Sequence, residues 1–330
     1  MTTGVFDELV PDVLGEPYLA ETITLPPDEE GPVVATLVVR RAAESTGRAV
    51  LYVHGFCDYF FQTAYAEWWT DRGYDFYALD LRKYGRSLRP HQTPNYVTDL
   101  RQHFGELDAA FHRVAERDGH DHIVLTAHST GGLIMSLWAN ERQPAVAGMV
   151  LNSPWLDMQG GKLMQGLGTS VVKQVGARQP SRLIPRTVGG HYGRSLHVEH
   201  AGEWPFNTDW KPLDSFPVTF GWLSAIRRGH AELQAGLEVG CPVLVLSSGG
   251  TRWPREMGDD VHNFDIVLEV PQIRKWATAI GRHVTYIAIE GARHDVVLSL
   301  PGPRAAAYAE IERWVRAYVD RGRDGVTQNG

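Results

Sequence analysis

A serine in a sharp turn between a strand and a helix is the clearest chemical feature of this sequence. Ser129 lies within residues 127–132, Ala-His-Ser-Thr-Gly-Gly, directly after the apolar run 123–126 and before a helix-like run that ends near Arg142. Small residues two positions before and after such a serine allow the chain to turn tightly and to raise the hydroxyl above the edge of a sheet. The pattern predicts a nucleophile elbow, although Ala127 stands where glycine is usual. The alternative is a serine in an ordinary glycine-containing helix cap.

A serine nucleophile needs a base that accepts its proton and an acid that orients the base. His294 is the candidate base because imidazole titrates near neutrality and because it follows the strand-like run 284–289. Asp265, in the loop after the strand-like run 242–246, is the candidate acid. The chain order is therefore Ser, Asp, His, with each residue placed after its own predicted strand.

An oxyanion hole is predicted from a second turn. His54, Gly55 and Phe56 follow the strand-like run 49–53. A turn after an early strand is where enzymes with such an elbow place one backbone N–H of the hole, and the residue after the nucleophile supplies the other. We expect the donors to be the N–H groups of Phe56 and Thr130. His54 is expected to be structural.

These motifs together resemble a known family. The segments 54–56, 80–87, 128–132 and 291–294 look like those of the monoacylglycerol lipase and lysophospholipase group of α/β hydrolases, often labelled "serine aminopeptidase-like". The resemblance covers the chain except its first twenty or so residues and its middle segment. It implies an α/β-hydrolase fold and hydrolysis of a carboxylic ester or thioester through a serine acyl-enzyme, without a cofactor.

The resemblance leaves the acid open. The loop after Leu246 begins Ser-Ser-Gly-Gly-Thr and lacks an aspartate where related enzymes often carry one. Asp265 lies at a family-like distance before the histidine, and residues 265–269 resemble the family's Asp-x-x-x-Asp. Residues 247–264 would then be an insertion. Asp157 is the competitor, because some α/β hydrolases take the acid from the loop after the preceding strand.

The predicted elements explain how these side chains could meet. Most strand-like runs are continuously apolar, which is typical of strands buried on both faces of a parallel sheet, and helix-like patterns lie between them. The sequence therefore predicts an α/β fold with a mostly parallel, doubly wound sheet. We expect three parts: a first core part at 1–154, an inserted cap or lid at 155–240, and a second core part at 241–330.

The segment 155–240 breaks the strand–helix alternation and is rich in aromatic residues. A cap over the strand ends would wall a substrate pocket and exclude water. We expect a mostly apolar ester substrate, and the candidate substrate-binding residues are Trp155, Trp204, Trp210 and Trp222. The alternatives are a surface excursion or a small private core.

Composition restricts the other possibilities. The 330 residues carry a net charge of −7 with scattered basic residues, which argues against a nucleic-acid partner. No apolar run is long enough to span a bilayer, and the start of the chain lacks the pattern of a secretory signal. Only two cysteines, Cys57 and Cys241, are present, so a disulfide framework is not expected. We expect a cytoplasmic location, where thiols stay reduced. The oligomeric state is not predicted.

Other functions stay open at this point. His191, His197 and His200 are spaced like metal ligands, but no carboxylate or cysteine cluster accompanies them, so no metal is expected. The same triad could serve an acyltransferase, an ester cyclase or an aminopeptidase. An aminopeptidase ranks below an esterase because the sequence shows no acidic cluster that would bind the amino group of a peptide substrate. A non-catalytic ligand-binding protein on the same fold is the rival from another class.

Overall fold

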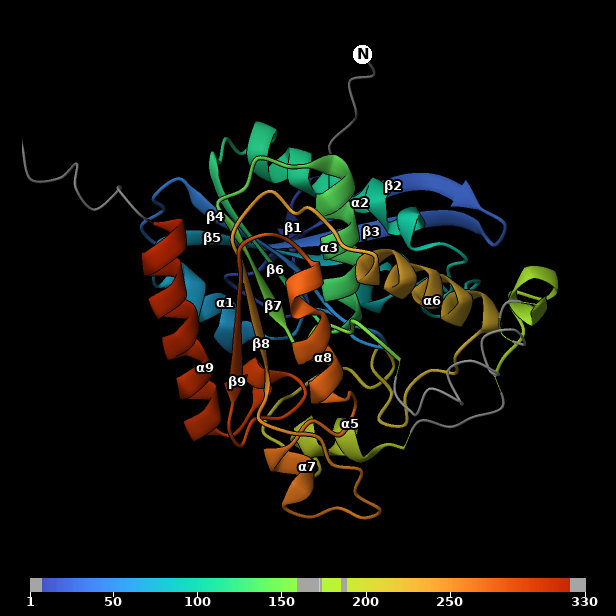
Figure 1. Ribbon diagram of the computed structural model, residues 1–330. Coiled ribbons are helices and arrows are strands. Elements are labelled where there is room, and N and C mark those ends of the chain that lie inside the picture. The colour runs from blue at the N-terminus through green and yellow to red at the C-terminus, as the bar shows by residue number, and fades with distance from the viewer. Residues whose placement is uncertain (1–7, 159–171, 173, 185–188, 321–330) are drawn as a thin grey trace, which may run out of the picture.

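The computed structural model describes residues 8–158, 172, 174–184 and 189–320. These residues include one nine-stranded sheet of order β1-β2-β3-β5-β4-β6-β7-β8-β9, shown in Figure 1. The six strands from β5 to β9 in that order pair in parallel, whereas β1, β2 and β3 join antiparallel at one edge. The strands are β1 (Val10–Pro11), β2 (Leu19–Asp28), β3 (Gly31–Arg40), β4 (Arg48–Val53), β5 (Tyr74–Asp80), β6 (His122–His128), β7 (Gly148–Asn152), β8 (Val243–Ser248) and β9 (Val284–Ile289).

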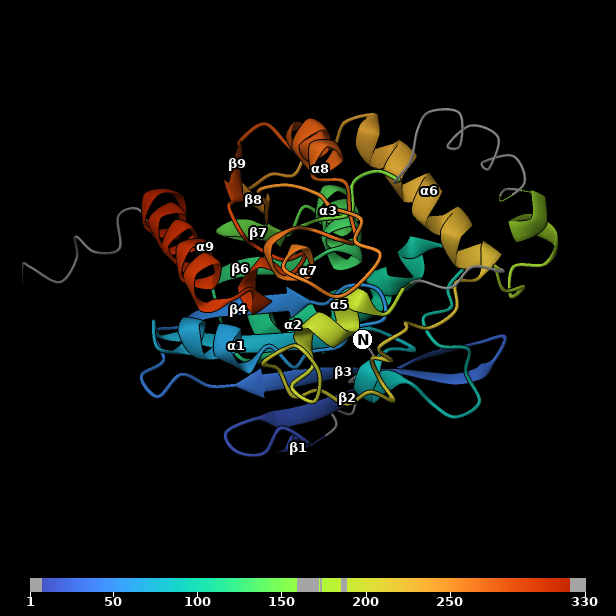
Figure 2. The ribbon, with the colours of Figure 1, turned by 90° about the horizontal axis from the view of Figure 1, so that it is seen from below.

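Helices cover both faces of the sheet, as Figures 1 and 2 show. Side chains of α1 and α9 join the hydrophobic cluster on one face, and those of α2, α3, α6 and α8 join the cluster on the other. The helices are α1 (Thr63–Thr70), α2 (Phe104–His112), α3 (Thr130–Arg142), α5 (His191–Leu196), α6 (Phe220–Gln234), α7 (Asp260–Asn263), α8 (Val270–Trp276) and α9 (Pro301–Trp314).

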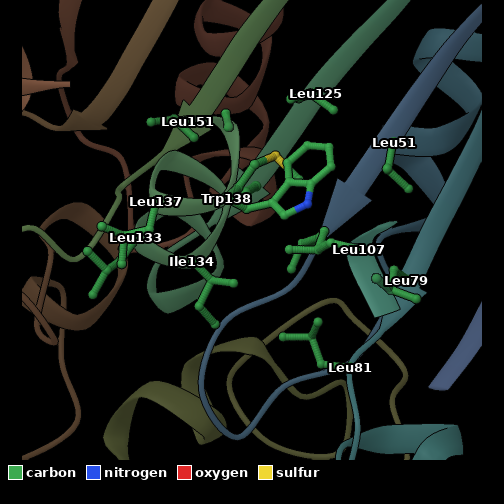
Figure 3. Close-up of a cluster of buried hydrophobic side chains, with 14 of the residues drawn as sticks. Leu51, Leu79, Leu81, Leu107, Leu125, Leu133, Ile134, Leu137, Trp138 and Leu151 are labelled. Carbon is green, nitrogen blue, oxygen red and sulfur yellow. The ribbon is translucent and has the colours of Figure 1, made fainter. Parts of the chain in front are cut away.

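The central strands are mostly apolar because each contributes side chains to both clusters. In β4, Leu51 and Val53 belong to the cluster beneath α3, and Val50 and Tyr52 belong to the cluster beneath α1 and α9. This alternation follows from the two-residue period of a strand. Figure 3 shows the α3 side, where Trp138 packs among leucines from the strands and α2. The predicted mostly parallel, helix-covered sheet is therefore present.

Sequence patterns missed the first strands of the sheet and the helices of the middle segment. The strand β2 contains Pro26 and Pro27 just before its last residue. Proline has no N–H to donate to the ladder and so hides the strand pattern, but a position near the sheet edge tolerates it. The helix α6 starts at a Thr219 cap, whose side chain accepts the Trp222 N–H at 3.2 Å. Its buried residues include two glycines and a histidine, which weaken the apolar pattern.

The segment between β7 and β8 is joined to the core. Leu156, Trp222, Ile226 and Leu233 belong to the same buried cluster as α3. A Cβ at Gly229 of α6 would lie 2.7 Å from Leu100 Cδ1, so this helix is packed closely on its neighbours. Among the described helices, none has the length and apolar character needed to cross a membrane.

Candidate active site

Ser129 occupies a strained turn at the end of β6. Its φ of 52° and ψ of −117° are sparsely populated for a residue with a side chain, and it forms the N-cap of α3. Its N–H donates to the Asn152 carbonyl at 3.0 Å, and its own carbonyl accepts the Trp155 N–H at 3.0 Å. Hydrogen bonds with the last residue of β7 and with the segment just after that strand therefore hold the turn in this conformation.

Close packing explains the glycines around the serine. A Cβ on Gly131 would lie 2.2 Å from the His54 carbonyl oxygen, and one on Gly132 would lie 2.7 Å from Pro154 Cβ. A Cβ on Gly55 would lie 2.9 Å from Ser129 Cβ. The glycines thus allow the start of α3 and the turn after β4 to pack against each other.

The structure brings Ser129, His294 and Asp265 into one line of hydrogen bonds. Ser129 Oγ lies 3.0 Å from His294 Nε2, and His294 Nδ1 lies 2.8 Å from Asp265 Oδ2. A carboxylate oxygen only accepts, so Nδ1 carries the proton and Nε2 is the acceptor for the serine hydroxyl. Asp265 is fully buried and His294 is 2 % exposed, so these bonds are shielded from water.

The loop after β8 explains how Asp265 reaches this position. After Gly250 the chain moves away from the end of β8, and at Asp265 it returns to lie beside Gly250. Two hydrogen bonds join the segments there: Asp265 N–H donates to the Gly250 carbonyl at 3.0 Å, and Arg252 N–H donates to the Asp265 carbonyl at 3.1 Å. Asp265 Oδ1 accepts the N–H groups of Val267 and Leu268 at 2.8 and 2.7 Å. The intervening residues are an excursion that places Asp265 at the end of β8.

Asp157, the competing acid, lies elsewhere. Its Oδ2 accepts the indole N–H of Trp276 at 3.0 Å, and its Oδ1 accepts the Met158 N–H at 2.8 Å. The structure therefore places Asp265, rather than Asp157, against the imidazole of His294.

The two predicted oxyanion donors are Phe56 N–H and Thr130 N–H. Neither amide hydrogen-bonds to another group within the described parts of the chain. The neighbouring His54 has a structural role: its Nε2 accepts the Leu81 N–H at 3.0 Å, which leaves Nδ1 to donate to the Gly55 carbonyl at 2.8 Å. Burial lowers the pKa of His54, so the ring is neutral and braces the turn.

Sequence reasoning missed three side chains around His294. The ring of His128 lies 4.7 Å from the His294 ring, and the ring of Tyr192, from α5, lies 5.5 Å from it. Asp295 is 1 % exposed and accepts a hydrogen bond from Asn152 Nδ2 at 2.6 Å. Only the position of His128 beside Ser129 gave a signal in the sequence. Tyr192 lies in the middle segment, where no element was predicted.

The four tryptophans divide into two groups. Trp222 packs against Phe56 with tilted rings whose centroids are 4.3 Å apart, and the ring of Trp155 lies 5.7 Å from that of Trp222. Trp204 instead donates its indole N–H to the Leu298 carbonyl at 3.0 Å, and Trp210 packs edge-on against Tyr59 at 5.2 Å. The structure thus places Trp155 and Trp222 beside the predicted oxyanion turn, whereas Trp204 and Trp210 pack in the cluster on the other face of the sheet.

The two cysteines are free and buried. Burial raises the pKa of the Cys57 thiol, which makes it a poor nucleophile although it directly follows Phe56. Of the three histidines with metal-like spacing, His197 contacts the Phe206 carbonyl through Nε2 at 3.1 Å, and its ring lies 5.8 Å from that of His200.

Comparisons with known proteins agree with this architecture. A family model described as "Serine aminopeptidase, S33" matches residues 44–299. None of the curated proteins is significantly similar to the chain in sequence.

Solved structures share the fold at low sequence identity. A soluble variant of monoglyceride lipase from Saccharomyces cerevisiae superposes with a TM-score of 0.66 at 14% identity, over 97% of this chain and 98% of the other. The monoacylglycerol lipase of Paleococcus ferrophilus gives 0.61 at 18%, over 86% and 99%. A carboxyl esterase from Bacillus coagulans gives 0.65 at 13%, over 91% and 99%. The expected α/β-hydrolase fold is confirmed.

Proposed function

Because the chain belongs to the serine aminopeptidase, S33, family of α/β hydrolases, we propose that it hydrolyses a carboxylic ester through an acyl-enzyme on Ser129. One observation carries the proposal: the line from Ser129 Oγ through the His294 ring to Asp265, at 3.0 and 2.8 Å. These distances suit transfer of the serine proton to Nε2 while the carboxylate holds the ring.

The proposed reaction has two halves. Ser129 Oγ attacks the ester carbonyl carbon as its proton moves to His294 Nε2, and the oxygen that becomes negative lies against the N–H groups of Phe56 and Thr130. His294 then returns the proton to the leaving alcohol, and the acyl group stays on Ser129. Water then attacks the acyl carbon while His294 takes its proton; the bond to Ser129 Oγ breaks, the carboxylic acid leaves, and His294 returns the proton to Oγ. Asp265 stabilises the imidazolium in both halves.

The proposed substrate is a mostly apolar ester of medium size. Phe56, Trp222 and Trp155 form an aromatic row beside the proposed oxyanion hole, and large aromatic faces favour apolar acyl or aromatic groups. The segment 155–240, which supplies Trp155 and Trp222, acts in this proposal as the cap. The structural neighbours include a monoglyceride lipase and a carboxyl esterase, which is consistent with an ester substrate.

Steady-state kinetics on p-nitrophenyl butyrate test the proposal. Ser129→Ala lowers kcat by roughly 10³- to 10⁶-fold because no other group forms the acyl-enzyme, while circular dichroism shows an unchanged fold. A Ser129→Ala protein with wild-type kcat rejects the assignment of the nucleophile.

A further inference from the structure

The segment 207–216 of the proposed cap contacts residues 57–59, the loop that directly follows the proposed oxyanion donor Phe56. Asn207 N–H donates to the Tyr59 hydroxyl at 2.6 Å, and Phe216 N–H approaches Cys57 Sγ at 3.3 Å. Between them, Lys211 Nζ lies 3.0 Å from Asp58 Oδ1 and 3.5 Å from the Cys57 carbonyl oxygen. Three consecutive loop residues directly after Phe56 are thus contacted by one stretch of the cap.

The central contact is a buried ion pair. Lys211 and Asp58 are 6 % and 3 % exposed. Their 3.0 Å approach is coulombic rather than a directed hydrogen bond, because Asp58 Oδ1 has no hydrogen-bond partner in the described structure. The ammonium also lies within 6 Å of the ring centres of Phe61, Tyr192 and Phe206, at 5.8, 5.5 and 5.8 Å.

Such a pair contributes little to stability compared with apolar residues, since desolvation opposes the attraction. It does restrict geometry, because any shift of the cap against the loop that keeps Lys211 and Asp58 buried would leave two charges without partners. The pair therefore favours one arrangement of the loop relative to the cap.

The backbone beside Phe56 needs such support. Cys57 has a φ of 49°, a left-handed conformation that residues with a side chain rarely adopt. Strain of this kind persists only where neighbouring contacts hold it. Here the cap contacts both the carbonyl and the sulfur of Cys57. A relaxed Cys57 would rotate the Phe56–Cys57 peptide and shift the Cα of Phe56, and this shift would carry with it the Phe56 N–H on the adjoining peptide.

We propose that Lys211, through Asp58 and the strained Cys57, is a positioning residue that aims the Phe56 N–H at the reacting carbonyl oxygen. The inference rests on the proposed function, because it assumes that Phe56 N–H stabilises an oxyanion formed by attack of Ser129. It gives the cap a part in transition-state stabilisation that is separate from any role in the pocket wall.

The double variant Asp58→Asn/Lys211→Met tests the inference, because it removes both charges and leaves none buried alone. Because the Phe56 N–H no longer points at the oxyanion, kcat on p-nitrophenyl butyrate falls by roughly 10- to 100-fold, whereas KM changes by less than about threefold. The inhibition constant of an alkyl trifluoromethyl ketone, to which Ser129 adds to form a hemiketal oxyanion, rises by a similar factor. A smaller folded fraction would also lower the apparent kcat at constant KM, but it would leave the ketone's inhibition constant unchanged, so the rise in that constant separates loss of positioning from loss of folding.

The control is Arg48→Met, which removes a cation paired with Asp320 at 3.2 Å at the start of β4, the opposite edge of the sheet from Ser129. It leaves kcat and the ketone's inhibition constant unchanged. Should the double variant fail to fold, Tyr59→Phe removes only the bond from Asn207 N–H, and kcat falls by roughly 2- to 10-fold.

Each failure has its own signature. The positioning role is overturned if the folded double variant binds the ketone with wild-type affinity. Where the double variant does not fold, wild-type affinity of Tyr59→Phe has the same meaning. In both cases Ser129→Ala is still inactive. Wild-type activity of Ser129→Ala rejects the proposed function itself, whatever the cap variants do.

Discussion

At the scale of single residues, burial decides how the proposed site works. Ser129, His294 and Asp265 are 7, 2 and 0 % exposed, so little water competes for their hydrogen bonds. Asp265 Oδ2 faces His294 while Oδ1 is occupied by two backbone N–H groups. The acid is thereby fixed in one rotamer, and it fixes the tautomer of the base.

Replacement of this acid therefore affects rate more than fold. In Asp265→Asn the amide can donate to His294 Nδ1, which leaves the wrong nitrogen protonated, and kcat on p-nitrophenyl butyrate falls by roughly 10²- to 10⁴-fold. Asp157→Asn is the matched control and changes kcat little, because Asp157 contacts Trp276 instead. The reverse order of the two effects would assign the acid to the loop after β7.

A buried histidine makes stability sensitive to acid. His230 donates from Nε2 to the Trp155 carbonyl at 2.9 Å, and burial lowers its pKa to about 4. In the unfolded chain His230 binds a proton near pH 6.5, whereas in the folded chain it does so only near pH 4. The stability that is fully present above pH 6.5 is therefore lost as the pH falls toward 4.

The loss assigned to His230 is about 2 kcal/mol between pH 7.5 and pH 5. Urea unfolding of the wild type and of His230→Gln at both pH values measures it. Other histidines are common to both proteins, so we expect the variant to lose about 2 kcal/mol less than the wild type. Equal losses in the two proteins would contradict the assignment.

The sequence predicted Ser129, His294 and Asp265 as partners because each follows a strand and parallel strands end at one edge of a sheet. It could not place Tyr192 or Lys211, which reach the site from a segment without a regular pattern. Nor could it separate Trp155 and Trp222 from Trp204 and Trp210, because composition does not show which face of the sheet a residue of the middle segment contacts.

At the scale of elements, the elbow depends on contact between the start of α3 and the end of β4. Gly131→Ala places a Cβ 2.2 Å from the His54 carbonyl, a backbone atom that cannot rotate away. We expect a loss of about 1–3 kcal/mol in the free energy of unfolding and a lower kcat, since the Thr130 N–H must move.

Gly302→Ala is the control for this change. It lies in α9 with no atom within 4 Å of an added Cβ, and alanine there should be neutral or slightly stabilising. Urea unfolding and ester hydrolysis measure both variants. Wild-type stability and rate in Gly131→Ala would show that the contact between α3 and β4 is looser than the structure gives.

The strands and core helices could be predicted because buried strands are continuously apolar and surface helices repeat every three to four residues. The elements β2 and α6 could not, because proline in β2 and polar residues in α6 break those patterns while tertiary contacts still stabilise them.

At the scale of the whole molecule, the proposed cap is continuous with the core and shapes the substrate preference. The value of kcat/KM on p-nitrophenyl esters should rise a few-fold per carbon from acetate and reach a plateau at a short to medium chain, since each buried CH₂ contributes about 0.8 kcal/mol. In Trp222→Leu the plateau should move to longer chains because space opens beside Phe56.

Trp210→Leu is the control from the same segment, because Trp210 packs against Tyr59 rather than Phe56. Its plateau should stay at the wild-type chain length. A flat profile, or an equal shift in both variants, would contradict the pocket proposed beside Trp222.

The central claim, that Ser129 is the nucleophile activated by His294, is tested most directly by mapping a fluorophosphonate adduct. After labelling of the intact protein, mass spectrometry of its peptides should find one adduct, on Ser129, and both Ser129→Ala and His294→Ala should prevent labelling. An adduct on another residue, or undiminished labelling of Ser129→Ala, would contradict the account.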